Sequence, residues 1–300
     1  MLSSLEIAGH HLTWGARTYV MGILNVTPDS FSGDGLLSAA GQDSPPAYTL
    51  LEMALQQARQ FIQDGADMID IGGESTRPGA AVVSAEEELE RVLPVVRALS
   101  SEDVLISIDT YKSEVAEAAL QAGAHLVNDV WGLRADPRLG EVAARYGAPV
   151  ILMHNRSSWA HAEIKERLGG RYVGMPYENL LEDVKRELLE SVQIAKAAGV
   201  QEDRIILDPG IGFGKTVEQN LELIDRLGEI RNLGYPVLLG PSRKSFIGYT
   251  LDLPPDQRLA GTAAAVALGI ARGADIVRVH DVQFMRRVAR MTDAMLHRSA

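Results

Sequence analysis

The sequence predicts an α/β protein that folds as a (β/α)8 TIM barrel, with residues 1–300 forming a single domain. Short apolar runs rich in β-branched residues alternate about eight times with longer stretches whose apolar residues have helical spacing. Near-continuous apolar strands are typical of parallel sheets covered by helices, and this number of units at this length fits a closed barrel. A doubly wound open sheet is the alternative. It is disfavoured because no Gly-rich dinucleotide turn follows the first strand.

The alternation between the spacing of apolar residues typical of strands and that typical of helices gives the order of the elements. The expected strands are residues 18–26, 67–72, 104–109, 125–130, 149–154, 204–208, 236–240 and 275–280. Helical spacing is found at residues 51–62, 86–99, 115–120, 180–198, 221–230 and 262–271. Residues 28–47 and 155–176 interrupt the rhythm and are expected to be long loops, which in compact barrels tend to be lids or binding segments. The sequence assigns no role to the second. No Ser-, Pro- or Gly-rich linker divides the chain, which favours one domain.

The composition excludes several classes of protein. Hydrophobic residues make up 46% and charged residues 23%, with a mean hydropathy of −0.02, as in ordinary globular proteins. No apolar run approaches the roughly 18 residues of a spanning helix, and the N-terminus lacks the features of a signal peptide, so a cytoplasmic protein is expected. The absence of cysteine excludes disulfides and thiolate chemistry. A net charge of −11 argues against binding to nucleic acid or to an anionic membrane.

Polar residues follow nearly every expected strand. They are Asn25, Asp70, Asp109, Asn128, Asp129, His154, Asp208, the run Ser242–Arg243–Lys244, Arg278 and His280. Because the C-terminal ends of parallel barrel strands converge on one face, we expect these side chains to meet in one pocket.

Several of these residues also have a purely structural interpretation. Asp109 could be the N-cap of the next helix, and Asp208 precedes Pro-Gly, where a turn role is plausible. Asp129 and Glu74 are interpreted as structural or functional with equal weight, and His154 as a hydrogen-bonded core histidine.

Arg278 and His280 lie two residues apart in a strand and therefore point to the same side. Since a buried cationic pair without an anionic partner would be costly, we expect an anion between them. The Gly-containing segments GGESTRPG (72–79) and DPGIGFGKT (208–216) could hold phosphate or carboxylate groups. The second is not a P-loop, because Pro209 stands where that motif requires glycine.

Taken together, these segments resemble the dihydropteroate synthase family along almost the whole chain. The resemblance is carried by MGILNVTPDSFSGDG (21–35), DIGGESTRPGA (70–80), SIDT (107–110), NDV (128–130), MH (153–154), DPGIGFGKT (208–216), PSRKSFIG (241–248), GTAAAV (261–266) and RVHDV (278–282). It implies a pterin-binding (β/α)8 barrel domain over residues 1–300. The implied enzyme is a transferase of folate biosynthesis that joins a pterin methyl diphosphate to 4-aminobenzoate and releases diphosphate.

The resemblance also implies roles for individual positions. Asn25 would contact the Mg²⁺ that accompanies the diphosphate, and Arg278 with His280 would hold the diphosphate itself. The residues implied at the pterin are Asp109, Asn128, Asp208 and Lys244, with Thr76 touching substrate from the second loop. Those implied around 4-aminobenzoate are Phe31, Arg77, Pro78, Phe213, Lys244 and Ser245. The first loop reads FSGDG where many relatives read FSDGG, so the loop acid would be Asp34, displaced by one position.

These residue types suit the chemistry that the resemblance implies. Carboxylates accept hydrogen bonds from the amino and ring N–H groups of a pterin, whereas an amide or ammonium serves its ring nitrogens and carbonyl. Mg²⁺ and the cationic side chains would absorb the charge of the leaving diphosphate. Asp109 and Asp34 would stabilise a pterin cation, and Lys244 would reach both substrates.

Two alternatives differ in function. A methyltetrahydrofolate-dependent methyltransferase would share the Asp and Asn contacts to the pterin, but it needs neither a diphosphate site nor a 4-aminobenzoate pocket. A catalytically silent pterin-binding barrel would be indicated by loss of Asn25, Arg77 or Lys244, and all three are present.

The sequence also leads to two expectations about assembly and binding order. The resemblance and the apolar-rich stretches 261–271 and 284–296 favour a homodimer. Residues 28–40 and 74–84 carry few core-forming side chains, so diphosphate is expected to order them before 4-aminobenzoate binds.

Overall fold

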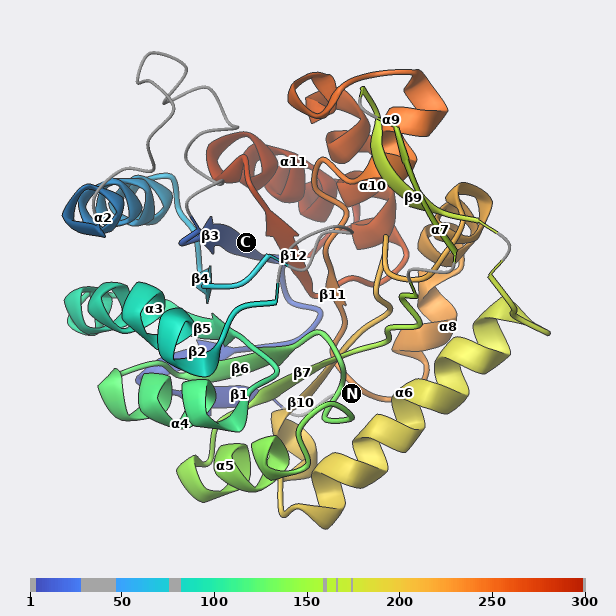
Figure 1. Ribbon diagram of the computed structural model, residues 1–300. Helices are drawn as coiled ribbons and strands as arrows, with labels where there is room; N and C mark the ends of the chain where they lie inside the picture. Colours follow the sequence, from blue (N-terminus) through green and yellow to red (C-terminus); the bar gives the residue numbers. More distant parts are fainter. Residues whose placement is uncertain are drawn as a thin grey trace.

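A closed barrel of eight parallel strands forms the centre of the molecule (Figure 1). The computed structural model describes residues 4–27, 47–75, 82–158, 161–165, 167–173 and 175–298. The barrel strands are β3 (Tyr19–Asn25), β4 (Met68–Gly72), β5 (Leu105–Asp109), β6 (Leu126–Asp129), β7 (Val150–Met153), β10 (Ile205–Asp208), β11 (Leu238–Leu239) and β12 (Ile276–Val279). A parallel bridge between Leu207 and Val237 joins the first and last strands of the sheet order. The predicted TIM barrel, with its expected strands, is therefore confirmed.

Helices surround the strands and follow each of them in turn (Figure 1). They are α2 (Ala47–Gln63), α3 (Ala85–Leu99), α4 (Ser113–Ala122), α5 (Arg138–Tyr146), α6 (Leu180–Ala197), α7 (Val217–Asp225), α8 (Leu227–Arg231), α9 (Ser245–Leu251), α10 (Leu259–Ala271) and α11 (Val282–Met295), with short 3-10 turns η2 (Glu202–Arg204) and η3 (Pro255–Gln257). The helix expected at 221–230 is two helices that meet at Arg226. The first begins earlier than expected, because Thr216 and Gln219 form a capping box.

The barrel interior is apolar in its N-terminal half. Each strand contributes one inward side chain to this layer: Met21, Met68, Leu105, Leu126, Ile151, Ile206, Leu238 and Ile276. A hairpin of β1 (Leu5–Ile7) and β2 (His10–Leu12) packs Leu5, Leu12 and Trp14 against the layer and so closes this end.

Side chains on one face of a strand recur every two residues, so the next inward layer lies two positions further along each strand. Two positions beyond the apolar layer lie Asp70, Ser107, Asn128, Asp208 and Arg278, from five different strands. The fold therefore places a set of polar side chains inside the barrel, at the C-terminal ends of the strands.

The segment after β7 differs from the long loop that the sequence predicts. Within residues 155–176 it contains an antiparallel hairpin of β8 (Ala162–Lys165) and β9 (Gly169–Tyr172). The hairpin lies beside α9 in Figure 1, where the Tyr249 hydroxyl donates to the Gly169 carbonyl over 3.1 Å. The two strands are too short and polar to produce a strong alternating pattern, which is why the sequence did not reveal them.

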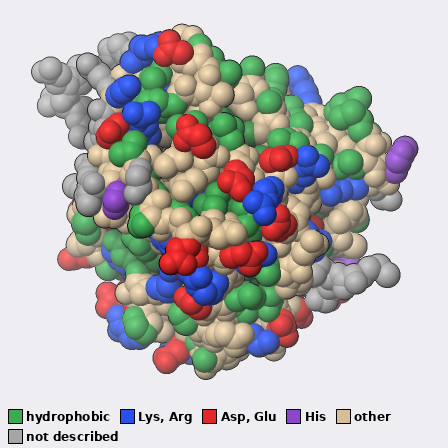
Figure 2. Space-filling model, turned by 90° about the vertical axis from the view of Figure 1, so that its right-hand side faces the viewer, with side chains coloured by type: hydrophobic (Ala, Val, Ile, Leu, Met, Phe, Trp, Pro, Cys, Tyr) green, Lys and Arg blue, Asp and Glu red, His purple; other side chains and the backbone are tan. Residues whose placement is uncertain are grey.

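The outer surface carries both signs of charge. On the face shown in Figure 2, acidic and basic side chains lie next to one another. On α6, Lys185 pairs with Glu182 and with Glu229 of α8, and such pairs neutralise one another locally. Within the described part of the chain, none of the helices is both long and apolar enough to cross a membrane.

Candidate active site

Arg278 lies at the centre of the polar layer and is paired with two carboxylates. Its Nε donates to Asp70 Oδ2 and its Nη2 to Asp109 Oδ2, both over 2.6 Å. The expectation that Arg278 lacks an anionic partner within the protein is therefore wrong. Its partners Asp70 and Asp109 lie on β4 and β5, far from Arg278 in sequence, so the sequence alone could not identify them. Asp70 Oδ2 also accepts from Asn128 Nδ2 over 2.9 Å, so one carboxylate orients both the guanidinium and the amide.

Asp109 is held in a low-dielectric environment with mixed charges. Burial raises the pKa of Asp109 to about 7, while Arg278 opposes the shift and the carboxylate of Asp70 adds to it. Its carboxyl group can therefore accept or donate a hydrogen bond near neutral pH. The N-cap interpretation is wrong, because α4 begins at Ser113 and the Ser113 N–H donates to Asp136.

Asp208 and Lys244 both contact the turn formed by residues 208–215. Asp208 Oδ1 accepts from the Gly210 N–H over 2.7 Å, which confirms the turn role, and burial raises the pKa of its carboxyl group. Lys244 donates to the Ile211 carbonyl, and its Nζ lies 4.5 Å from the centre of the Phe213 ring. Burial lowers the pKa of Lys244 to about 8, with the charge of Asp208 opposing the shift.

His280 is oriented by Ser242. The Ser242 hydroxyl oxygen accepts from the His280 backbone N–H over 3.1 Å and lies 3.0 Å from His280 Nδ1. The hydroxyl proton can go to Nδ1, and in that tautomer Nε2 carries the N–H of the ring. Ser245 is the first residue of α9, directly after Lys244.

Asn25 ends β3, and Gly72 of β4 lies between it and Asp109 of β5 in the register of the sheet. The two side chains flank Gly72: a Cβ atom at that glycine would lie 3.6 Å from Asp109 Oδ2 and 3.7 Å from Asn25 Oδ1. An amide oxygen next to a carboxylate fits Mg²⁺, which is usually bound by one or two protein oxygens together with substrate phosphates. In the described ranges, no group of three or more His, Asp or Glu side chains could hold a metal on its own.

Five residues implied by the resemblance lie outside the described part of the chain. They are Phe31, Asp34, Thr76, Arg77 and Pro78.

Three residues with uncertain roles are structural in this fold. His154 is a buried histidine with hydrogen bonds on both ring nitrogens, to Glu187 over 3.1 Å and to Lys215 over 2.9 Å, as expected. Asp129 accepts from the N–H groups of Trp131 and Leu133 and so forms a turn. Glu74 forms an ion pair with Lys112.

The sequence placed Asp70 in the expected pocket but indicated no partner for it, and it indicated no individual role for Lys215. The two-residue offset of Asp70 from Met68 is consistent with its inward position. Lys215 was judged only as part of a glycine-rich segment, and nothing in its neighbours indicates that its ammonium is buried.

Comparisons with known proteins point to one family. The model of a family described as "Pterin binding enzyme" matches residues 21–280. The dihydropteroate synthase of Bacillus subtilis is 51% identical over 288 residues, which cover 96% of this chain and 92% of that protein. That of Clostridium beijerinckii is 47% identical over 296 residues, covering 98% and 100%.

Solved structures agree with the sequence relatives. A crystal structure of dihydropteroate synthase from Clostridium difficile, in the presence of pteroic acid, is 48% identical with a TM-score of 0.82, and the match covers 95% of this chain and 98% of that one. The Xanthomonas albilineans enzyme with 4-aminobenzoic acid is 39% identical with a TM-score of 0.84, covering 99% of both chains. The match therefore extends over the whole barrel, including the strands that carry the polar layer. On this evidence the chain belongs to the dihydropteroate synthase family of pterin-binding enzymes.

Proposed function

We propose that this chain catalyses the condensation of (7,8-dihydropterin-6-yl)methyl diphosphate with 4-aminobenzoate to 7,8-dihydropteroate and diphosphate, a transferase step of folate biosynthesis. The observation that carries the proposal is the polar layer, where residues from separate strands meet at the C-terminal end of the barrel. Relatives with the same fold have been solved with pteroic acid and with 4-aminobenzoic acid, which are chemically a close relative of the product and one substrate.

Pterin recognition is assigned to Asp109, Asn128, Asp208 and Lys244. The carboxyl groups of Asp109 and Asp208 accept from the amino and ring N–H groups of the pterin. Asp70 uses one N–H of the Asn128 amide, which leaves the second N–H and the carbonyl oxygen for the pterin. The ammonium of Lys244 donates to the remaining acceptors.

The diphosphate is assigned to Arg278 and His280, with Asn25 holding Mg²⁺ beside Asp109. The Nε2–H of His280 supplies a donor, and Arg278 supplies positive charge next to the bond that breaks. When bound, Mg²⁺ neutralises charge on the leaving diphosphate.

Bond formation needs only a weak nucleophile held in place. As the methylene carbon loses diphosphate, the carboxylates of Asp109 and Asp34 stabilise the developing pterin cation. The aromatic amine then attacks the same carbon, and the new C–N bond is completed as the amine loses one proton to solvent. The 4-aminobenzoate pocket is assigned to Phe31, Thr76, Arg77, Pro78, Phe213, Lys244 and Ser245. Excluding water, which competes for the cation, is the main demand on this pocket.

We further propose that the enzyme is a cytoplasmic homodimer that binds small molecules and no nucleic acid. Apolar side chains on α10 and α11 are exposed, including Leu268, Phe284, Met291 and Met295, with 39%, 42%, 62% and 60% of their surface accessible. Packing these helices across a two-fold axis would bury them.

The proposed activity is tested by measuring diphosphate release from purified protein with Mg²⁺ and the pterin substrate. Release that depends on 4-aminobenzoate supports the proposal. Release at the same rate without 4-aminobenzoate would show a hydrolase and reject it.

A further inference from the structure

Lys215 is a buried lysine two residues after Phe213, at the end of the 208–215 turn. Only 1% of its surface is accessible, and it lies among the largest fully buried side chains of the described residues. A buried ammonium is costly unless its donors are all used. Neither the sequence motifs nor the proposed reaction explains why the ammonium group of Lys215 is buried.

The Nζ atom of Lys215 has three close acceptors, which are His154 Nδ1 at 2.9 Å, the Gly210 carbonyl at 2.9 Å and the Phe213 carbonyl at 3.0 Å. The His154 carbonyl is a fourth, longer contact at 3.5 Å. An ammonium donates three hydrogen bonds and accepts none, so this geometry matches the protonated form. Burial lowers the pKa of Lys215 well below its ordinary value, while the charge of Asp208 acts in the opposite direction.

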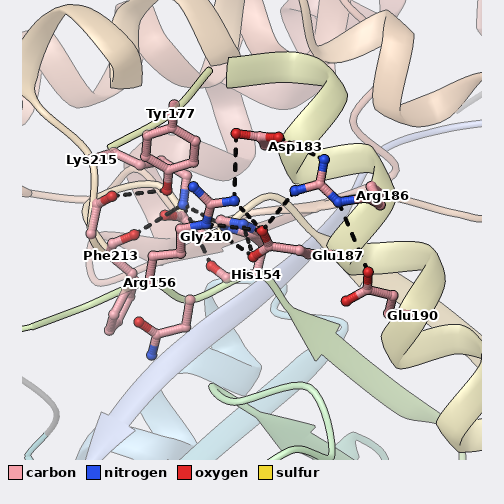
Figure 3. A network of polar contacts seen from close by, with 12 residues as sticks. His154, Arg156, Tyr177, Asp183, Arg186, Glu187, Glu190, Gly210, Phe213 and Lys215 are labelled. Carbon is pink, nitrogen blue, oxygen red and sulfur yellow. Dashed lines mark hydrogen bonds and ion pairs between the residues drawn. The ribbon is translucent and has the colours of Figure 1, made fainter. Parts of the chain in front are cut away.

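His154 connects Lys215 to α6, as Figure 3 shows. Burial, together with the charge of Lys215, lowers the pKa of His154 to about 3, so the ring is neutral. Its Nε2–H donates to Glu187 while Nδ1 accepts from Lys215. Glu187 is held in turn by the Arg156 guanidinium, whose Nε lies 2.9 Å from Glu187 Oε1. The acceptor for Lys215 is therefore fixed by a continuous network.

The loop that Lys215 holds has an unusual backbone. Gly210, Gly212 and Gly214 have φ angles of 71°, 82° and 62°. A Cβ atom at Gly210 would lie 1.8 Å from the His154 carbonyl oxygen, so this turn packs directly on the segment after β7. Within the turn, the Phe213 N–H donates to the Gly210 carbonyl over 3.1 Å. Side chains donate to other carbonyl groups of the loop: the Tyr177 hydroxyl donates to Gly214 over 2.9 Å.

The same loop also contacts Lys244. Lys244 donates to the Ile211 carbonyl, between the two carbonyl groups that Lys215 holds, and it lies over the Phe213 ring. A shift of the Gly210 or Phe213 carbonyl would therefore displace both contacts of Lys244.

We propose that Lys215 is a positioning residue of the reaction: its buried ammonium fixes the Gly210–Phe213 turn, so that Phe213 and the Ile211 carbonyl hold Lys244 at the 4-aminobenzoate side of the site. This inference rests on the proposed function. Asn128 and Arg278 are held by Asp70, and Asp109 is held by Arg278, so these three groups do not depend on the turn. Asp208 and Lys244 contact the turn and are assigned to the pterin as well, whereas Phe213 is assigned to 4-aminobenzoate alone.

The test replaces Lys215 by methionine, which keeps the length of the side chain and removes its donors. The matched control is Lys185→Met, since Lys185 is a lysine of α6 whose ion pairs lie at the surface. For Lys215→Met we expect the KM for 4-aminobenzoate to rise tenfold or more. The KM for the pterin diphosphate should rise by a smaller factor, because Asn128, Arg278 and Asp109 keep their mutual hydrogen bonds. The control should match the wild type in both constants.

Two further variants keep the proposal falsifiable if Lys215→Met does not fold. His154→Gln retains a donor for Glu187 but removes the ring acceptor of Lys215, and should raise the KM for 4-aminobenzoate in the same selective way. Lys215→Ala should regain affinity for 4-aminobenzoate when ethylammonium is added, but not with ethanol. Unchanged constants, equal increases in both KM values, or rescue by ethanol would overturn the proposal. An inactive wild type would instead reject the proposed function, so the two failures are distinguishable.

Discussion

At the scale of single residues, the ion pair between Arg278 and Asp70 orients the side chains of the proposed site. Asp70 is fully buried and accepts from both Arg278 and Asn128, so it fixes a guanidinium and an amide at once. Charge-assisted hydrogen bonds of this kind are shorter and stronger than neutral ones. The side chains that we propose to contact the substrates are therefore oriented by hydrogen bonds within the protein, as electrostatic stabilisation of a transition state requires.

Replacing Lys244 by alanine tests its assignment to both substrates. Because the residue is partly buried and carries a charged donor, its loss should cost about 2–5 kcal/mol of binding. We expect the Michaelis constants for the pterin diphosphate and for 4-aminobenzoate both to rise in steady-state kinetics. Unchanged values for both substrates would remove Lys244 from the site.

The pH dependence of kcat/KM tests the protonation state of Lys244. This constant reports the pKa values of the free enzyme. Since Lys244 acts as an ammonium and its pKa is lowered to about 8, kcat/KM should fall as the pH rises through that value. In Lys244→Arg the guanidinium stays charged, so this alkaline limb should be absent even if the maximum is lower. The same limb in the arginine variant would assign it to another group.

At the scale of elements, the barrel could be predicted from sequence because periodicity reports directly on strands and helices. The β8–β9 hairpin could not, since strands such as Gly169–Tyr172 carry few apolar residues and are held by contacts from elsewhere. The residues of the site could be predicted only at positions that match the family motifs. Contacts across the barrel, such as Arg278 with Asp70, depend on the closure of the sheet and have no local sequence signal.

Arg258 joins the hairpin to the segment that presents Lys244. Its guanidinium donates to the carbonyl groups of Arg243, Leu253 and Leu168, and only 2% of the residue is accessible. Arg258→Met would leave these carbonyls without donors, at a cost of about 1–3 kcal/mol for each buried group that finds no new partner. We expect a clear fall in the urea midpoint. Arg59→Met is the control, since Arg59 is an exposed arginine of α2 whose ion pair lies at the surface. Equal midpoints for the two variants would contradict this role.

The order of substrate binding is a prediction about residues 28–40 and 74–84. The resemblance places Phe31, Arg77 and neighbouring residues of the 4-aminobenzoate pocket on these segments, most of which lie outside the described part of the chain. If diphosphate organises them, 4-aminobenzoate should bind with positive coupling of roughly 1–3 kcal/mol. Calorimetric titration of 4-aminobenzoate, alone and with pterin, diphosphate and Mg²⁺, measures this. Equal affinity in both titrations would mean that the pocket is preformed.

At the scale of the whole molecule, the apolar packing and the proposed site occupy different halves of the barrel interior. The N-terminal half of the interior is filled by apolar side chains and closed by the β1–β2 hairpin, whereas the C-terminal half holds the charged and amide groups. Two positions further along five of the eight strands, the inward side chain is polar.

Oligomeric state is tested by light scattering at micromolar concentration. We expect twice the chain mass of 32.5 kDa for the wild type. Phe284→Asp, on α11, should give the monomer mass, because a charge would be buried between subunits. Leu189→Asp, a similarly exposed position on α6, should leave the dimer intact. A monomeric wild type would reject the homodimer.

The central claim, that this chain joins a pterin to 4-aminobenzoate with loss of diphosphate, is tested most directly by following a labelled substrate. Purified enzyme, Mg²⁺, the pterin diphosphate and ¹³C-labelled 4-aminobenzoate are mixed, and product and diphosphate are quantified by mass spectrometry and a coupled assay. The account predicts labelled dihydropteroate and diphosphate in equal amounts. Diphosphate without labelled dihydropteroate, or neither, would contradict it.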